Sequence, residues 1–141
     1  MFSSAIKNGK PPLIYEDGKQ IRDFIHIKDL VRGKLLLLDH PRANYGVYNI
    51  GTETPSYILE LAQTLINLYG KSFAPNIIHK FRNGDIRHCY ADASKIKDLG
   101  FEPKISLEEG LKDLVAWGES QTAVSKVDDA HRELVAKGLV V

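Results

Sequence analysis

The sequence predicts a mixed α/β fold that is rich in helix and contains only short strands. Apolar residues recur at helical spacing in several segments, most clearly at Ile58, Ala62, Leu65, Ile66 and Tyr69. Between such segments, short runs of β-prone residues are bounded by Gly, Pro, Asn or Asp. The length of 141 residues, with 43% hydrophobic and 26% charged residues, is that of one ordinary globular domain.

The elements follow along the chain from these patterns and from the turn residues between them. Strands are expected where β-prone residues stand between turn signals, at residues 13–15, 22–27, 47–50 and 76–80. Helices are expected at residues 2–8, 28–39, 54–69, 94–99, 106–117 and 124–138.

Capping residues support several of these helix ends. Thr54 is a natural N-cap with Pro55 at the first helical position, and Gly70 ends the same helix. Ser106 and Glu109 have the spacing of a capping box, which predicts a helix start there.

The helix at residues 28–39 is apolar over more than one face. Leu30, Val31 and the run 35–38 cover more than one stripe of it. A helix of this kind is normally buried on two sides, so we expect it to need a partner surface beyond this chain.

Composition excludes several classes of function. The net charge of +1 argues against a nucleic-acid-binding surface. A single cysteine, Cys89, cannot form an internal disulfide and fits a reducing, cytoplasmic compartment. The longest strongly apolar run, 35–38, is far too short to cross a membrane, and the histidines and Cys89 show no zinc-like spacing, so we expect no metal.

Two arginines stand in charged turns beside strand-like sequence. Arg22 follows the turn at Asp17-Gly18, and Arg82 begins the turn Arg82-Asn83-Gly84-Asp85. Guanidinium groups hold phosphate oxygens in a planar, often bidentate geometry, so this pair suits gripping one anion from two sides. The alternative is two solvated surface arginines.

Four stretches, in order and in register, resemble a known family. They are residues 12–29 (PLIYEDGKQIRDFIHIKD), 47–52 (VYNIGT), 82–95 (RNGDIRHCYADASK) and 99–111 (LGFEPKISLEEGL). Together they resemble the extended short-chain dehydrogenases/reductases, the nucleotide-sugar epimerases and dehydratases, and are most similar to the 4-epimerases of UDP- and dTDP-sugars. The likeness covers about residues 1–118.

The resemblance, together with what the sequence lacks, implies a position within such an enzyme. No Gly-rich turn of the dinucleotide-binding kind occurs. Tyr15 and Lys19 have the spacing of the family's catalytic pair, but they flank a turn instead of sharing a helix face. We therefore expect the C-terminal, substrate-binding part of a Rossmann-type enzyme, with the Rossmann half and its NAD absent and the chain alone inactive. Residues 1–118 would be the nucleotide-sugar-binding domain and 119–141 a helical extension.

Six site residues follow from the resemblance: Leu13 and Tyr15 for the pyrimidine edge, Arg22 and Arg82 for the diphosphate, Asp85 for a ribose hydroxyl, and Cys89 for the sugar pocket. Each has a structural alternative. Leu13 and Tyr15 can be plain strand residues, Asp85 can cap its own turn, and Cys89 can be a small buried hydrophobe. Asp23 and Asp29 are expected to be structural, and Arg87 to assist the phosphates or face water.

The function implied by the resemblance is that of an NAD-dependent nucleotide-sugar 4-epimerase. In such enzymes a hydride passes from sugar C4 to NAD and returns to the other face after the keto sugar rotates. The substrate would be a UDP- or dTDP-sugar, and a cytoplasmic homo-oligomer is expected. The alternatives are a 4,6-dehydratase or decarboxylase of the same family, or a non-catalytic interaction domain.

Overall fold

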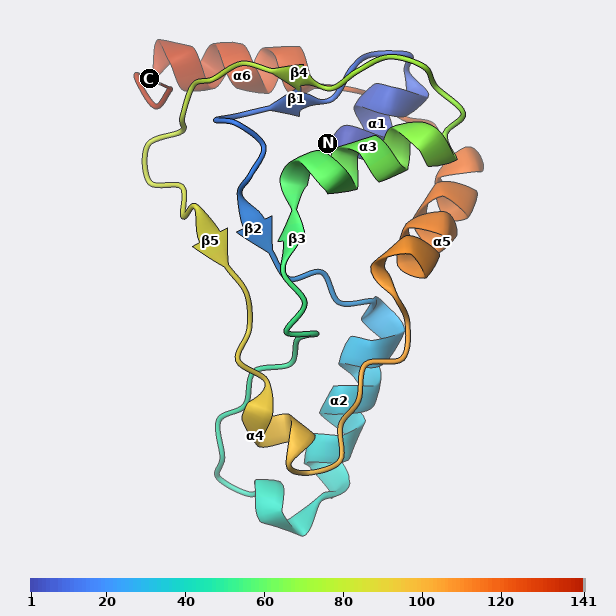
Figure 1. The fold of residues 1–141 in the computed structure, drawn as a ribbon, viewed down its shortest axis with the longest axis vertical. Helices are drawn as coiled ribbons and strands as arrows, with labels where there is room; N and C mark the ends of the chain where they lie inside the picture. Colours follow the sequence, from blue (N-terminus) through green and yellow to red (C-terminus); the bar gives the residue numbers. More distant parts are fainter. Residues whose placement is uncertain (141) are drawn as a thin grey trace.

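The computed structural model describes residues 1–140 and has a mixed α/β fold in which short strands connect longer helices (Figure 1). The helical segments are α1 (Phe2–Lys7), α2 (Ile27–Asp39), the 3-10 turn η1 (Pro41–Ala43), α3 (Ile58–Leu68), α4 (Ser94–Lys97), α5 (Leu107–Glu119) and α6 (Val127–Ala136). The strands are β1 (Leu13–Ile14), β2 (Ile21–Arg22), β3 (Ser56–Tyr57), β4 (Asn76–Ile77) and β5 (His88–Cys89).

The strands form two small sheets. β1 pairs in parallel with β4, with Leu13 opposite Asn76. β2 lies between β3 and β5, antiparallel to the first and parallel to the second. In that sheet Arg22 lies opposite Ser56 on one side and Cys89 on the other, so β2 is the central strand.

Two hydrophobic clusters hold the two ends of the elongated molecule. The first joins α1, α3 and α5 through the buried residues Ile6, Leu65, Ile66 and Leu111. The second joins α4 to α2 through Ala93, Ile96 and Phe101 together with partly buried Leu36 and Leu37. Figure 1 shows these groups of helices at opposite ends, with β2, β3 and β5 between them.

The carboxylate of Asp23 links three segments at the end of β2. It accepts hydrogen bonds from the backbone N–H of Thr52 at 3.0 Å, of Glu53 at 3.1 Å and of Ala91 at 3.4 Å, and from the Thr52 hydroxyl at 2.5 Å. A Cβ at Gly51 would lie 2.5 Å from Asp23 Oδ2, so only glycine leaves room for the carboxylate. Asp23 is structural, as expected.

Asp29 is the second structural carboxylate and is fully buried in the first turn of α2. It accepts the backbone N–H of Lys104 and of Ile105, both at 2.9 Å, and pairs with Arg32 at 2.7 Å. These bonds attach the segment before α5 to the start of α2.

Several predicted elements differ from the structure. The strand expected at residues 22–27 is only Ile21–Arg22, and the one expected at 76–80 is only Asn76–Ile77. Residues 47–50 form no strand, because no neighbouring strand among residues 1–140 pairs with them. Thr54 and Pro55 do not begin a helix: residues 56–57 pair with β2 instead, so α3 begins only at Ile58. By contrast, Ser106 and Glu109 form the predicted capping box at the start of α5.

The apolar stripe of α2 is largely open to solvent. Ile27, Val31, Leu35 and Leu38 follow one another along the helix, and Ile27 and Leu38 are 62% and 78% exposed. The expected self-association of the chain stays a prediction that this surface makes physically reasonable. Among the described helices, none has both the length and the apolar character that crossing a bilayer requires.

We predict that Asp23→Asn destabilises the fold. The amide keeps the shape of the carboxylate but turns an N–H donor toward backbone N–H groups that need an acceptor. An unsatisfied buried group costs about 1–3 kcal/mol. Because Asp23 is only partly buried, the free energy of unfolding measured with denaturant should fall by about 1 kcal/mol, toward the lower end of that range. Asp39→Asn, at the exposed end of α2, is the control and should change it by less than about 0.5 kcal/mol. Equal stability of the two variants would contradict the role of Asp23.

Candidate functional site

Five of the six predicted site residues line one cleft of about 210 Å³. Leu13 and Tyr15 come from β1 and the residue after it, Arg22 from β2, and Arg82 and Asp85 from the turn before β5. The rest of the lining includes Phe2 and Ile58, which give the cleft an apolar floor.

The strand pairings bring these residues together. Glu16 N–H donates to the carbonyl of Lys80 at 2.9 Å, which continues the β1–β4 pairing toward the Arg82 turn. Ile21 N–H donates to the carbonyl of Arg87 at 3.1 Å and holds the far side of that turn against β2. The turn at residues 82–85 is therefore held beside both β1 and β2.

Arg22 is fixed by backbone carbonyls rather than by a carboxylate. Its Nη1 donates to the carbonyl oxygens of Ile21 at 2.7 Å and Arg87 at 3.0 Å, and its Nη2 to that of Ile86 at 2.7 Å. These bonds use three of the five N–H groups of a guanidinium and leave its charge uncompensated by them. A held, unneutralised cation in a cleft is suited to an anionic ligand.

Arg82 is held differently, by its neighbour three residues later. Its Nε and Nη2 lie 2.8 Å and 2.6 Å from Asp85 Oδ2. Its guanidinium carbon also lies 4.9 Å from the centre of the Tyr15 ring, a cation–π contact. The carboxylate of Asp85 therefore binds Arg82. The sequence predicted instead that it would bind a ribose hydroxyl or cap its own turn.

Tyr15 connects this cleft to the last helix. Its hydroxyl lies 2.7 Å from His131 Nδ1 on α6. Burial raises the pKa of the Tyr15 hydroxyl, although the nearby Arg82 charge acts in the opposite direction. Tyr15 is therefore a neutral hydrogen-bonding group near pH 7, and His131 is a contact that sequence reasoning missed because α6 is remote in the chain.

Arg87 is neither a solvated surface residue without a partner nor a residue that lines the cleft. It pairs with Glu16 and, at 2.8 Å, with Asp17. The hydrogen bond from Arg87 lowers the pKa of Asp17 to about 2. Glu16 has φ 55°, a left-handed conformation that glycine adopts more easily. Its ion pair with Arg87 offsets part of that strain.

Cys89 lies apart from the other five residues but next to Arg22. It lines a second cleft of about 400 Å³ with Arg22, Asn49 and Tyr90. The thiol is exposed, so the alternative of a small buried hydrophobe is wrong. Arg22 lines both clefts, so the two share this side chain.

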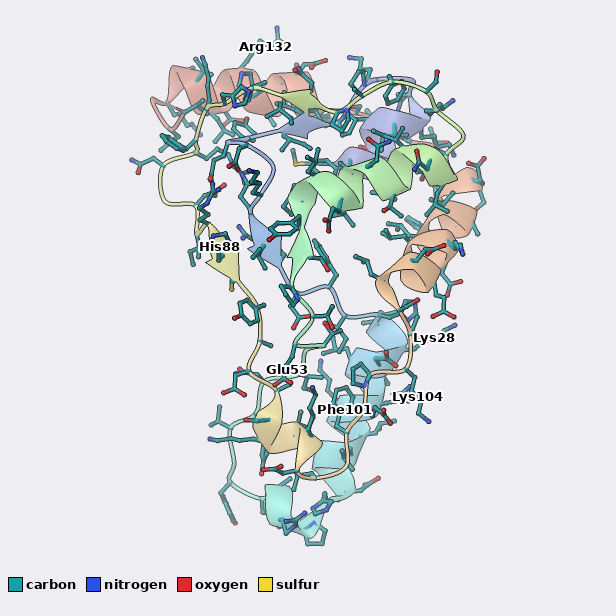
Figure 2. The ribbon with its side chains drawn as sticks, in the orientation of Figure 1. Lys28, Glu53, His88, Phe101, Lys104 and Arg132 are labelled. Carbon is teal, nitrogen blue, oxygen red and sulfur yellow. The ribbon has the colours of Figure 1, made fainter. Side chains whose placement is uncertain are left out.

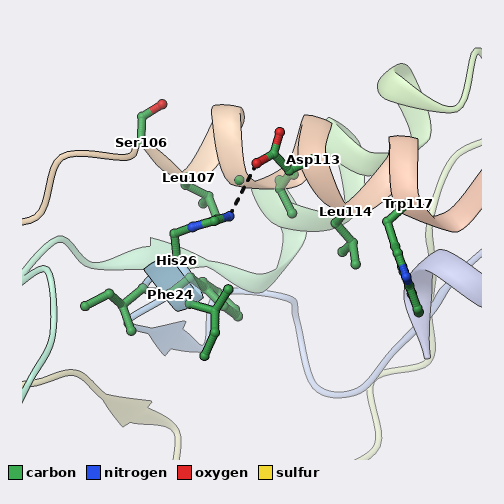
Figure 3. A pocket seen from close by; sticks show the side chains of 11 residues that line it. Phe24, His26, Ser106, Leu107, Asp113, Leu114 and Trp117 are labelled. Atoms are coloured by element: carbon green, nitrogen blue, oxygen red, sulfur yellow. Dashed lines mark ion pairs between the residues drawn. The ribbon is translucent and has the colours of Figure 1, made fainter. Parts of the chain in front are cut away.

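A third hollow, mainly apolar, lies between the start of α2 and α5 (Figure 3). It measures about 350 Å³ and includes Phe24, Leu114 and Trp117. Two of its polar side chains face each other, with His26 Nε2 3.5 Å from Asp113 Oδ2. None of the six predicted residues lines it. Residues 1–140 contain no cluster of His, Cys, Asp and Glu that could hold a metal ion.

Comparison with known proteins shows what this fold and cleft are related to. Residues 1–51 match the model of the NAD dependent epimerase/dehydratase family. A dTDP-L-rhamnose 4-epimerase of Burkholderia thailandensis is 32% identical over 118 residues, which are 83% of this chain and 32% of that protein. A UDP-glucuronate 4-epimerase of Thermodesulfobacterium geofontis is 35% identical over 127 residues, 89% of this chain and 38% of that protein.

Solved structures give the same relationship. The UDP-glucose 4-epimerase of Thermotoga maritima, solved with UDP-glucose, superposes with a TM-score of 0.77 at 34% identity over 84% of this chain and 38% of that one. The chain is therefore a fragment related to the NAD-dependent epimerases and dehydratases, homologous to nucleotide-sugar 4-epimerases, with an α/β fold of the extended short-chain dehydrogenase/reductase type. It spans about a third of the length of the curated relatives that it matches.

One expectation from the sequence is corrected by these findings. We expected specifically the C-terminal, substrate-binding portion of the enzyme. The model of the NAD-dependent family instead matches residues 1–51, the first third of the chain, which overturns that placement and leaves the coarser description of a family fragment. The expectation rested on the absence of a Gly-rich dinucleotide-binding turn. The absence of one motif does not show from which part of an enzyme a sequence comes.

We predict that Arg87→Gln raises the pKa of Asp17 from about 2 toward its ordinary 3.8, because the main hydrogen bond to the carboxylate is lost. Since the pKa is depressed in the folded chain, the stabilisation by this pair is complete above pH 3.8 and is lost as the pH falls toward 2. Carboxyl carbon shifts followed by NMR measure the pKa. Arg132→Gln, on α6, should leave it unchanged, and an unshifted Asp17 in Arg87→Gln would contradict the pairing.

Proposed function

We propose that the chain is a nucleotide-sugar-binding part of an NAD-dependent 4-epimerase that acts on a UDP- or dTDP-sugar. The observation that carries the proposal is the meeting of Arg22 and Arg82, sixty residues apart in sequence, in one cleft with Leu13, Tyr15 and Asp85. Residues 1–118 form the binding domain and residues 119–141 its helical extension.

The arginines take the diphosphate in this proposal. Arg22 is already held by carbonyl oxygens and needs no rearrangement to meet a phosphate. Arg82 must exchange its bonds to Asp85 for bonds to phosphate oxygens. That exchange frees the Asp85 carboxylate to accept a ribose hydroxyl, so one ligand satisfies both side chains.

The base and the sugar of the ligand occupy the two clefts that share Arg22. Leu13 and Tyr15, at the edge of the cleft, offer backbone donors and acceptors to a pyrimidine. The sugar enters the larger cleft at Cys89, where the small side chain leaves room. A diphosphate fixed at Arg22 with a loosely held sugar permits the sugar to turn over, as epimerisation requires.

NAD supplies the hydride acceptor in enzymes of this family. Residues 1–140 contain no Gly-rich turn of the kind that cradles a dinucleotide pyrophosphate at a helix start. The chain by itself should not turn over a nucleotide sugar.

Two other functions have support from single observations. The family model covers epimerases and dehydratases, so a 4,6-dehydratase or decarboxylase would use the same diphosphate grip. The exposed apolar stripe of α2 favours an interaction domain without catalysis as the candidate from another class. Failure of UDP and dTDP to bind, combined with stable association through α2, would favour that second candidate.

We predict that Arg82→Gln weakens UDP binding to this chain by tenfold or more. Hydrogen bonds to charged groups contribute about 1.5–3 kcal/mol, and 1.4 kcal/mol is a factor of about ten in the dissociation constant. Isothermal titration with UDP and with dTDP measures the loss.

The matched control is Arg132→Gln, because Arg132 also pairs with an aspartate three residues away. Figure 2 shows Arg132 at the outer side of α6, and Arg132 does not line the cleft. This variant should bind UDP like the wild type. Equal binding by Arg82→Gln and Arg132→Gln would contradict the diphosphate grip.

We predict that Cys89→Tyr, made in the full-length enzyme, discriminates against sugars with a bulky 2-substituent. The added ring fills the second cleft, so an N-acetylated substrate should lose more in kcat/KM than its plain hexose counterpart. A difference of about tenfold is the scale expected for one steric contact in a pocket. Cys89→Ser keeps the side chain small and should treat the two substrates as the wild type does. Equal losses for both substrates in Cys89→Tyr would contradict the placement of Cys89 in the sugar pocket.

A further inference from the structure

The C-terminal helix α6 contacts the candidate cleft from outside, through His131. Its Nδ1 lies 2.7 Å from the Tyr15 hydroxyl, and the two ring centres are 5.8 Å apart with an interplanar angle of 48°. Both side chains are partly buried. His131 itself does not line the cleft, so any effect on a ligand must pass through Tyr15.

A second contact joins the residues after α6 to the Arg82 turn. Asn83 N–H donates to the carbonyl of Leu139 at 2.8 Å, and Arg82 and Val140 form an antiparallel bridge. The chain end that carries His131 therefore also supplies a strand-like partner to the turn that carries Arg82.

The other end of the same segment is attached to the N-terminal part of the chain. Lys10 Nζ lies 2.6 Å from Asp128 Oδ2, and Asn8 Nδ2 donates to the carbonyl of Ala123 at 2.9 Å. Figure 1 shows α6 at the same end of the molecule as β1, β4 and the chain's N-terminus. The helix is thus held at both ends while His131 points at Tyr15 from its middle.

These contacts form a continuous series of side chains, from His131 to Tyr15 and from Tyr15 to Arg82. A tyrosine side chain has two rotatable bonds, so fixing its hydroxyl fixes the ring. The guanidinium of Arg82 packs on that ring at 4.9 Å. Immobilising a flexible side chain on binding costs conformational entropy, and a ring that already holds Arg82 reduces that cost.

We propose that His131 is a positioning residue for the nucleotide site: it fixes the Tyr15 ring, and through it Arg82, in the arrangement that receives a diphosphate. The inference rests on the proposed function and deepens it. It makes α6 part of the binding machinery, acting through one hydrogen bond and not through ligand contact.

The test compares substitutions at the two ends of the hydrogen bond in the 141-residue chain, with UDP as the probe. His131→Phe keeps a ring but removes the bond, and should raise the dissociation constant about three- to tenfold. His131→Asn places an amide near the position of Nδ1 and should recover most of the loss. Tyr15→Phe should cause the same loss as His131→Phe, and the double variant should add nothing further, because one shared bond is removed.

The control is Glu133→Gln, which removes an exposed ion pair with Lys137 on the same helix and should bind UDP like the wild type. A merely structural role for His131 would not give rescue by His131→Asn together with non-additivity at Tyr15. If His131→Phe fails to fold, the comparison of His131→Asn with Tyr15→Phe decides: tight binding by the first and weakened binding by the second supports the proposal.

The outcomes separate the two proposals. Wild-type chain that binds neither UDP nor dTDP overturns the proposed function, and this inference with it. Wild-type chain that binds UDP, with His131→Phe binding equally well, overturns the inference alone and leaves the nucleotide site standing. Additive losses in the double variant would also overturn it.

Discussion

Two adjacent side chains at the end of β2 hold together segments that are far apart in sequence. Arg22 donates to the carbonyl oxygens of Ile86 and Arg87, and Asp23 accepts N–H groups from Thr52, Glu53 and Ala91. One residue needs acceptors and the next needs donors, so together they fix the segments on both sides of the central strand. Both side chains are partly buried, and loss of either would leave several backbone groups without their partners.

The partners of Arg22 and Asp23 also explain why the positive charge of Arg22 is available for a ligand. Asp23 is the carboxylate nearest to Arg22 in sequence, yet its oxygens are occupied by backbone N–H groups. Arg22 therefore keeps an uncompensated positive charge between two clefts. Arg82 and Arg87 instead pair with carboxylates, at Asp85 and at Glu16 and Asp17. Three arginines of similar sequence setting thus have different chemistry, decided by which acceptors the fold places beside them.

Local signals in the sequence predicted many of the helices, and the family resemblance named five residues that the structure brings to one cleft. The capping box at Ser106 and the helix α2 depend on neighbours close in sequence, and the structure confirms them. Asp23 and Asp29 are structural as predicted, but through bonds to segments far along the chain that the sequence did not specify. The strand expected at residues 47–50 was wrong because pairing needs a partner that no local pattern specifies. His131 was missed for the same reason: its contact with Tyr15 spans most of the chain. The family motifs also did not locate the fragment within the enzyme.

The most direct test of the account follows the arginine side chains themselves during titration of the chain with UDP. Each Nε–Hε group gives its own signal in a ¹⁵N-resolved NMR spectrum. The account predicts that the signals of Arg22 and Arg82 shift together and saturate at the same UDP concentration, whereas the signal of Arg132, on the outer side of α6, stays in place. Saturable UDP binding that leaves Arg22 and Arg82 unshifted would contradict it.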